Sequence, residues 1–154
     1  MPDCFLSYAT PNVAFARSIH DVMKAHGLET FLAPISLRPG QDWTDGIKEN
    51  LQNTRWVLFL ASRQACRSDN VQQEVGGAFF GGKTIIPIVW DMDPKKLPGW
   101  TNRIQAVDLR NKTPVEIAVR MRSIAESLRA SKFKSDLITL GLIGGLLYLA
   151  SKSK

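Results

Sequence analysis

Residues 56–60 have the sequence Trp-Val-Leu-Phe-Leu, five apolar residues in a row. A strand with one face in water alternates apolar and polar residues, whereas an unbroken apolar run predicts a strand covered on both faces. Strands of that kind belong to parallel sheets with helices on both sides. This stretch therefore predicts an α/β fold.

Similar runs recur along the chain. The other predicted strands are residues 4–8, 28–31 and 84–89, with a weaker one at 106–109. Helical segments fall between them, and right-handed crossovers then favour a flavodoxin-like arrangement around a central parallel five-stranded sheet. Ligands of such sheets bind at the carboxyl ends of the strands. We therefore expect the site in the loops that follow these strands, after Tyr8, Phe31, Leu60 and Val89.

Helix boundaries can be predicted at several positions. Thr10 and Pro11 suggest an N-cap followed by proline at the first helical position, and Gly27 suggests a C-terminal stop. Residues 43–52 predict a short second helix, and Ser68 or Asp69 can cap a third that runs toward Phe80.

The last predicted helix begins with a capping box, Thr113 and Glu116, and extends to about Ser131. Its apolar residues have helical spacing, which favours a core-facing stripe over a binding face. They are Ile117, Met121, Ile124 and Leu128.

Composition sets broad limits. The chain has 154 residues, one domain's worth, and a formal charge of 20 − 14 = +6. That charge weakly favours anionic partners such as nucleotides, nucleic acid or anionic lipid, and a solvated basic surface explains it as well.

Cys4 and Cys66 form no C-x-x-C pair, and without a recognisable secretory signal we expect reduced thiols and a cytoplasmic location. His20 and His26 are six residues apart in a predicted helix and do not share a face, so we expect no metal site.

Residues 77–84, Gly-Ala-Phe-Phe-Gly-Gly-Lys-Thr, fit the phosphate-loop pattern G-x-x-x-x-G-K-[ST] at every position. A phosphate loop works because it follows a strand and opens a helix whose N-terminus points at the phosphate. Here the order is reversed, since a helix carrying Glu74 precedes the motif and Thr84 begins a strand. Gly81 and Gly82 then indicate a helix stop, which argues against ATPase and kinase activity.

Three segments resemble the TIR (Toll/interleukin-1 receptor) domain family. Residues 3–9, Asp-Cys-Phe-Leu-Ser-Tyr-Ala, resemble the family's first box, and residues 30–43 resemble its second box and BB loop. Residues 68–74, Ser-Asp-Asn-Val-Gln-Gln-Glu, resemble the segment that carries the catalytic glutamate of TIR domains that consume NAD. The resemblance covers about residues 2–130. The family's third box, a Phe-Trp pair that belongs more to receptor and adaptor members, is not evident, which favours a bacterial-type enzyme.

The sequence departs from the enzymatic pattern at two positions. Asn70 stands where relatives often carry an aromatic residue four positions before the glutamate, and Asn12 stands where an acid commonly follows the first box. These departures affect the expected stacking of the substrate more than its cleavage.

The resemblance implies cleavage of the nicotinamide–ribose bond of NAD, which is a substrate here and not a cofactor. The products would be nicotinamide and either ADP-ribose or a cyclic isomer, in bacterial antiphage signalling or NAD depletion. Glycoside hydrolysis usually needs a second carboxyl group to protonate the leaving oxygen. Nicotinamide is already cationic in NAD and leaves neutral, so one carboxylate that stabilises the oxocarbenium-like transition state can suffice. The resemblance assigns this role to Glu74, whose alternative is an ordinary exposed glutamate on a helix.

The predicted substrate-binding residues follow from the strand ends and the resemblance. Trp43 could stack on a base or simply pack on the sheet, and Arg38 could meet a phosphate or a second protein. The tip of the BB loop, Arg38-Pro39-Gly40, is expected to mediate self-association, and no nucleic acid partner is expected. The predicted substrate-binding set is Ser7, Tyr8, Ala9, Thr10, Phe31, Ala33, Arg38, Trp43 and Asn70.

The C-terminal segment, residues 132–154, is predicted to be separate from a TIR domain at residues 1–131. Residues 137–150 are uncharged and mostly apolar, and as a helix they would span roughly 21 Å, short of the ~30 Å membrane core. Lysines flank the run on both sides, and Gly141 and Gly145 permit close helix packing. A hydrophobic helix that contacts a membrane or drives oligomerisation is favoured over one that docks on its own domain.

Two other functions remain open from the sequence. A non-catalytic TIR scaffold would bind other TIR domains through the BB loop. A related nucleoside-processing enzyme, such as a deoxyribosyltransferase, would act on free nucleosides instead of NAD.

Overall fold

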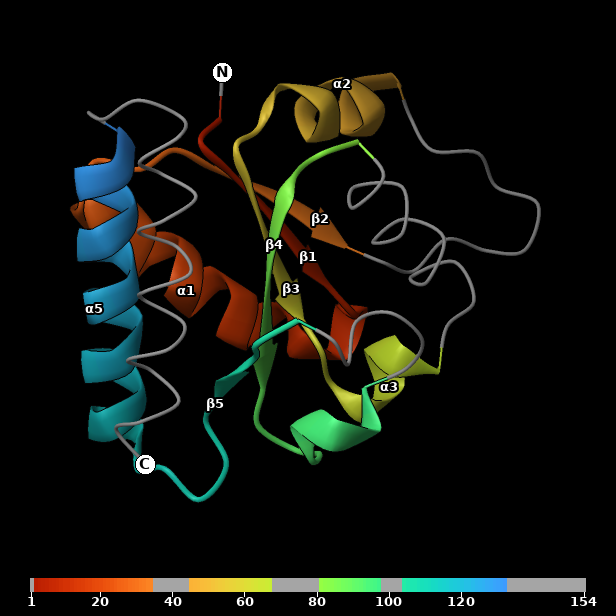
Figure 1. Cartoon of the computed structure of the whole chain (residues 1–154), viewed down its shortest axis with the longest axis vertical. Coiled ribbons are helices and arrows are strands. Elements are labelled where there is room, and N and C mark those ends of the chain that lie inside the picture. Colours follow the sequence, from red (N-terminus) through yellow and green to blue (C-terminus); the bar gives the residue numbers. More distant parts are fainter. Residues whose placement is uncertain (1, 35–44, 68–80, 98–103, 133–154) are drawn as a thin grey trace.

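The computed structural model describes residues 2–34, 45–67, 81–97 and 104–132, except the side chains of 34 and 45–48. Five parallel strands form one sheet in the order β2-β1-β3-β4-β5 (Figure 1). This order confirms the predicted flavodoxin-like fold. The strands are β1 (Cys4–Tyr8), β2 (Thr30–Pro34), β3 (Trp56–Leu60), β4 (Thr84–Val89) and β5 (Val107–Asp108).

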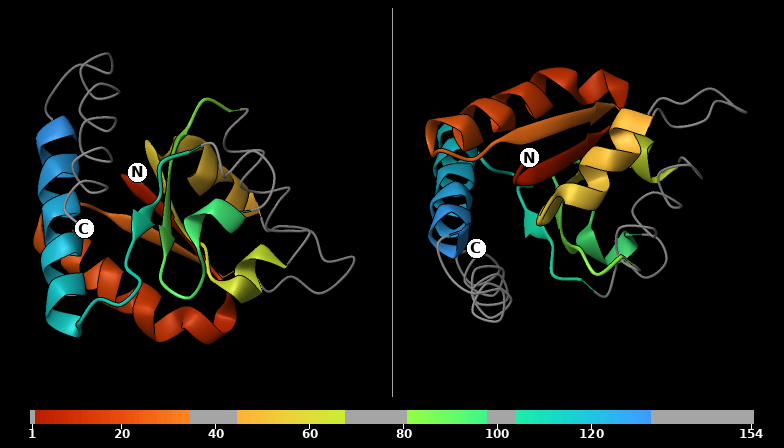
Figure 2. Two further views of the ribbon diagram at one scale, coloured as in Figure 1. Left: turned by 60° about the horizontal axis from the view of Figure 1, so that its bottom comes forward. Right: turned by 90° about the horizontal axis from the view of Figure 1, so that it is seen from above.

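Helices cover both faces of the sheet (Figures 1 and 2). Helices α1 (Val13–Ala25) and α5 (Pro114–Lys132) pack on one face, which we call the α1–α5 face. Helices α2 (Asp45–Asn53) and α3 (Arg63–Cys66) lie on the other, the α2–α3 face. Each face has its own apolar core, as expected for strands buried on both sides.

The run at 56–60 forms β3, and all five of its residues are buried. Trp56, Leu58 and Leu60 belong to the core of the α1–α5 face, whereas Val57 and Phe59 belong to the core of the α2–α3 face. The same alternation in β1 places Leu6 and Tyr8 on the first face and Phe5 on the second.

The first helix differs from its prediction at the start. A 3₁₀ turn, η1 (Thr10–Asn12), precedes α1, and Thr10 is not an N-cap. The stop at Gly27 is confirmed, because Gly27 has φ +76° and the next amide, Leu28 N–H, donates to Met23 O at 3.0 Å. Residues 27–29 therefore complete the helix end, and β2 begins at Thr30, two residues after the predicted strand start.

The motif at 77–84 ends as predicted. Gly82 adopts φ +77° in a turn, and Thr84 is the first residue of β4. The Lys83 ammonium donates to the carbonyl of Gln52, near the end of α2, at 2.5 Å. No helix follows Lys83 and Thr84, so the phosphate-loop interpretation is excluded.

Helix α5 begins with the predicted capping box. Glu116 N–H donates to Thr113 Oγ1 at 3.2 Å, and Thr113 N–H donates to the Glu116 carboxylate at 3.5 Å. The predicted stripe faces the core, with Met121, Ile124 and Leu128 buried and Ile117 packed against them.

Other predictions differ in their bounds. The second helix spans Asp45–Asn53 and ends one residue later than predicted, while its predicted start at residue 43 lies outside the described residues. The short α3 was not predicted. The predicted third helix, residues 68–80, and the predicted C-terminal helix, 137–150, lie outside the described residues. In the part of the chain that the structure describes, no helix combines the length and hydropathy needed to cross a membrane.

Candidate functional site at the carboxyl edge of the sheet

The strand order creates a switch point between β1 and β3, which are neighbours in the sheet. The loop after β1 leads to α1 on one face, and the loop after β3 leads to α3 on the other. In doubly wound sheets, ligands bind where two such loops diverge at the carboxyl ends of the strands. The described part of the candidate site therefore consists of residues 9–12 and 61–63, with the strand ends beneath them.

The structure separates the two residues predicted at the end of β1. Ser7 is 2% exposed, and pleating places it on the α2–α3 face, in register with Ala33 of β2 and Phe59 of β3. Tyr8 is 6% exposed and packs in the core of the α1–α5 face. The two side chains therefore cannot line the same side of the sheet.

Of the other predicted residues, Ala9, Phe31 and Ala33 lie with Ser7 on the α2–α3 face. Thr10 is exposed at the start of η1. Phe31 stacks on Phe5, with ring centroids 5.7 Å apart and 23° between the planes. One side of the Phe31 ring is therefore occupied by the core.

On the α2–α3 face of β1 and β2, side-chain size falls toward the carboxyl edge. Phe5 and Phe31 occupy earlier positions in these strands, and Phe59 of β3 is in register with Ser7. The positions that follow them on this face hold small side chains, which let a ligand approach the backbone closely. These small residues are Ser7, Ala9, Ala33 and Ala61, all buried.

The loop after β3 is braced by side-chain hydrogen bonds. Ser62, 1% exposed, has an extended backbone and caps α3, since its Oγ accepts from Ala65 N–H at 3.1 Å. Asp91, two residues beyond β4, accepts from Arg63 N–H at 3.1 and 3.3 Å. The sequence pointed to both loops but to neither residue. A serine just before a helical segment is the signal that would have identified Ser62.

The loop after β1 is held differently. Asn12 N–H donates to Ala9 O at 2.8 Å, but the Asn12 side chain makes no capping bond to α1. One turn later, the rings of Phe15 and Trp90 meet edge to face with centroids 4.8 Å apart. Because Trp90 directly follows β4, this contact holds the first turn of α1 against the carboxyl edge of the sheet.

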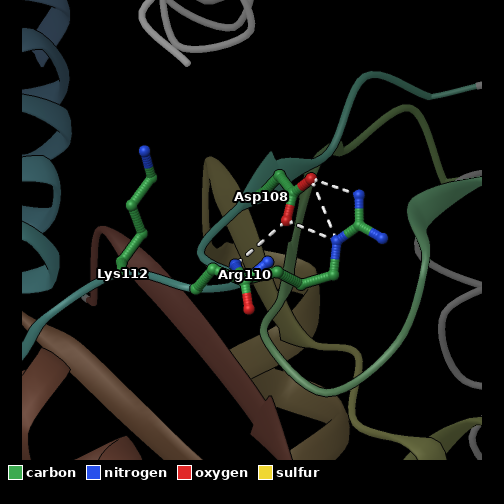
Figure 3. A pocket seen from close by; sticks show the side chains of 4 residues that line it. Asp108, Arg110 and Lys112 are labelled. Atoms are coloured by element: carbon green, nitrogen blue, oxygen red, sulfur yellow. Dashed lines mark hydrogen bonds and ion pairs between the residues drawn. The ribbon is translucent and has the colours of Figure 1, made fainter.

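A pocket of about 270 Å³ lies at the end of β5, lined by Asp108, Arg110, Asn111 and Lys112 (Figure 3). The Arg110 guanidinium donates to Asp108 from Nε at 3.0 Å and from Nη2 at 2.8 Å, and Lys112 extends away from this pair (Figure 3). The hydrogen bond to Asp108 raises the pKa of Arg110. Asp108 therefore has a structural role as the partner of Arg110.

The other acids described at this edge also have structural roles. Asp93 accepts from Lys95 N–H at 2.9 Å, and Asp91 and Asp108 accept the bonds given above. Each of these three carboxylates therefore stabilises a loop. The predicted catalytic acid, Glu74, and the other predicted residues Asn70, Trp43 and Arg38-Pro39-Gly40 lie outside the described residues.

The surroundings of both cysteines disfavour the reactive thiolate form. Burial, followed by the nearby Asp3, raises the pKa of the Cys4 thiol to about 12. Burial, followed by Asp91, raises that of Cys66 to about 11. Both side chains are free thiols. Over the described ranges, no three His, Cys, Asp or Glu side chains gather as a metal site requires.

Comparisons with solved structures identify the same architecture at low sequence identity. The TIR domain of the Toll-related receptor TRR-2 from Hydra magnipapillata matches with a TM-score of 0.64 and 16% identity, covering 84% of this chain and 99% of that one. A TIR-STING receptor from C. gigas, solved with 2',3'-cGAMP, matches with a TM-score of 0.63 and 16% identity over 82% of this chain and 40% of that one. A flavodoxin-like domain from Synechococcus sp. matches with a TM-score of 0.58 and 11% identity over 82% of this chain and 96% of that one. At these identities the likeness shows a shared fold.

The family assignment comes from the sequence. No curated protein sequence matches the chain. A family model described as "TIR domain" matches residues 4–132, which contain the whole described sheet and its helices. The chain therefore belongs to the TIR domain family.

Proposed function

We propose that this protein cleaves the nicotinamide–ribose bond of NAD, with Glu74 as the catalytic carboxylate. The single observation that carries the proposal is the TIR family match over residues 4–132, because the family includes NAD-cleaving enzymes and the matched region contains Glu74. The products would be nicotinamide and ADP-ribose or a cyclic isomer of it.

The chemistry of the carboxyl edge supports this choice. Asp91, Asp93 and Asp108 each hold a loop together, so the described acids at this edge already have structural duties. A reaction whose leaving group departs neutral needs one further carboxylate and no general acid. A glutamate near the ribose would stabilise the positive charge that develops as nicotinamide leaves.

The small residues at the strand ends support a nucleotide site. Ser7, Ala9 and Ala33 leave the backbone of β1 and β2 without bulky side chains at the edge where ligands of this fold bind. The remaining expected contacts, Arg38 to a phosphate and Trp43 to a ring, belong to the proposal. Phe31 would contribute its edge, since one side of its ring packs on Phe5.

Release of nicotinamide from NAD tests the proposal directly. Wild type, Glu74→Gln and Glu126→Gln would be incubated with NAD at several protein concentrations, and the products separated by liquid chromatography and mass spectrometry. Glu126 is a matched control because it is exposed on α5, far along the chain from the site. We expect release by wild type and Glu126→Gln but not by Glu74→Gln. Product mass and retention separate ADP-ribose from a cyclic isomer.

The solved relatives favour a second candidate, a TIR scaffold that acts through assembly. Two of them come from receptors. A further match, the TIR domains of the activated Roq1 resistosome, has a TM-score of 0.53 and 16% identity, covering 98% of this chain and 84% of that one. A scaffold would self-associate through Arg38-Pro39-Gly40, and Gly40→Ala would disrupt its oligomers. The scaffold gains support if wild type oligomerises yet releases no nicotinamide at any concentration.

The proposed setting is a signalling protein of the cytoplasm, in antiphage defence. Residues 137–150, with their flanking lysines, would add a membrane contact or an oligomerising helix. Co-sedimentation of the full chain and a chain ending at residue 132 with anionic vesicles separates these two roles.

A further inference from the structure

Asn12 holds the position before α1 at which asparagine commonly caps a helix. A capping side chain needs an extended backbone, so that its oxygen can accept from an N–H in the first helical turn. Here η1 runs directly into α1, and Asn12 has φ −96° and ψ 15°, the conformation of a turn. Ser62 shows the contrast, with φ −73°, ψ 161° and a formed cap.

The Asn12 carboxamide is consequently left without its usual structural role. Its Oδ1 is buried and has no hydrogen-bond partner among the described residues, while the residue as a whole is partly exposed. A buried acceptor without a donor destabilises the fold, and such groups are rare in native proteins. A partner supplied by a ligand would remove this cost.

Its place in the fold distinguishes Asn12 from other buried polar atoms that lack a partner within the described ranges. Thr30 and Trp56 begin β2 and β3, at the opposite edge of the sheet, and His20 lies about two turns into α1. Asn12 lies one 3₁₀ turn beyond β1, at the switch point, and the Phe15–Trp90 contact holds that turn against the carboxyl edge.

We propose that Asn12 is a substrate-binding residue whose Oδ1 accepts a hydrogen bond from an N–H or O–H donor of the bound dinucleotide. The inference rests on the proposed function and adds a residue that selects the substrate. Because Asn12 is partly exposed, rotation of its side chain can bring the oxygen to a ligand between the loops at 9–12 and 61–63. NAD offers three donors of this class, the amino group of adenine, the carboxamide of nicotinamide and the ribose hydroxyls.

The experiment compares wild type, Asn12→Ala and the matched control Asn53→Ala, an exposed residue at the end of α2. The KM and kcat for nicotinamide release and the melting temperature are measured for each, and NAD binding is measured by calorimetry. For Asn12→Ala we expect a rise in KM of about 3- to 10-fold, the loss of one hydrogen bond, with kcat little changed. The melting temperature should be no lower than that of wild type, because no intramolecular bond is lost. Asn53→Ala should match wild type throughout.

Nicotinamide hypoxanthine dinucleotide, which lacks the adenine amino group, identifies the donor. If the amino group is the donor, wild type binds this analogue as weakly as Asn12→Ala binds NAD, and the variant does not distinguish the two. If a ribose hydroxyl or the nicotinamide carboxamide is the donor, Asn12→Ala weakens both dinucleotides equally.

An unchanged KM in Asn12→Ala, or a fall in its melting temperature, overturns the inference and leaves the proposed function intact. If wild type neither cleaves nor binds NAD, the proposed function fails and the inference fails with it.

Discussion

The two edges of the same sheet are built in opposite ways. At the amino edge, the Asp3 carboxylate accepts from Glu29 N–H at 2.8 Å and from the Lys132 ammonium at 3.1 Å. Its backbone carbonyl accepts from Arg55 and Trp56 at 3.1 and 3.2 Å. One residue thereby connects β1, β2, β3 and the end of α5.

The carboxyl edge has small side chains on the α2–α3 face of β1 and β2 and a braced loop after β3. In its loop after β1, the Asn12 carboxamide does not cap α1. The difference teaches that this fold separates stability from ligand binding along the strand direction. At the amino edge the carboxylate and the backbone carbonyl of Asp3 are bonded within the chain, whereas the carboxyl edge keeps a carboxamide that a ligand can satisfy. Substitutions at the two edges should therefore change different quantities.

The largest effect is expected at the proposed catalytic carboxylate. Under the proposed function, Glu74→Gln should lower the rate of nicotinamide release about 100-fold or more, because it would remove the charge that stabilises the transition state. Its melting temperature should stay near that of wild type. Chromatographic assay of nicotinamide at saturating NAD measures the effect. Equal rates in Glu74→Gln and wild type would contradict the assignment, and Glu126→Gln controls for the loss of a charge.

A substitution at the amino edge should instead lower the stability of the fold. Asp3→Ala removes the carboxylate that accepts from the Glu29 N–H and from the Lys132 ammonium, which keeps its 3.5 Å contact with Gly27 O. This loss should cost about 2–3 kcal/mol in the free energy of unfolding. For a chain of this size that lowers the melting temperature by roughly 4–12 °C. Urea unfolding followed by circular dichroism measures it, with Asp21→Ala, an exposed acid on α1, as the control. Loss of nicotinamide release in the folded variant would show that the edges are not separate.

A smaller change is expected at Gly82, which turns the chain into β4 at the amino edge with φ +77°. Within the described part of the chain, no neighbouring atom lies within 4 Å of an added Cβ, so the expected cost of Gly82→Ala is conformational. We expect about 1 kcal/mol less stability from thermal melting. Gly82→Asn, which tolerates this backbone region better, should lose less. A larger loss for asparagine than for alanine would contradict this explanation.

The smallest effect concerns the thiols, with Cys4 at the amino edge and Cys66 beyond the loop at the carboxyl edge. Folding raises the pKa of Cys4 from 9.0 to about 12 and that of Cys66 from 9.0 to about 11. Folding therefore favours the protonated thiols. This contribution to stability is fully present below pH 9 and is lost as the pH rises toward 11 and 12. Both thiols should react slowly with Ellman's reagent at pH 8, and Cys66, the less buried, should react first. Faster labelling in Cys66→Ser than in Cys4→Ser would reverse that order.

Much of the fold was predictable because its signals are local. Apolar runs such as 56–60 indicate strands buried on both faces, and the glycine at 27 and the capping box at 113 and 116 fix helix ends through backbone geometry. The start of β2 was misplaced because Leu28 is apolar for a different reason, since it packs where the end of α1 meets the sheet. The short α3 was missed because it has only four residues, and its first amide is held by Asp91, 28 positions from Arg63 along the chain.

The sequence by itself determined the α/β class, the sheet topology, the family resemblance and the rejection of a phosphate loop at 77–84. Each of these depends on the order of residues along the chain. Only the tertiary structure decided that Ser7 and Tyr8 face opposite sides, that Asp91 and Asp108 stabilise loops, and that the buried Asn12 oxygen has no partner among the described residues. Pleating, pairing and burial depend on which distant segments pack together, and no local pattern records them.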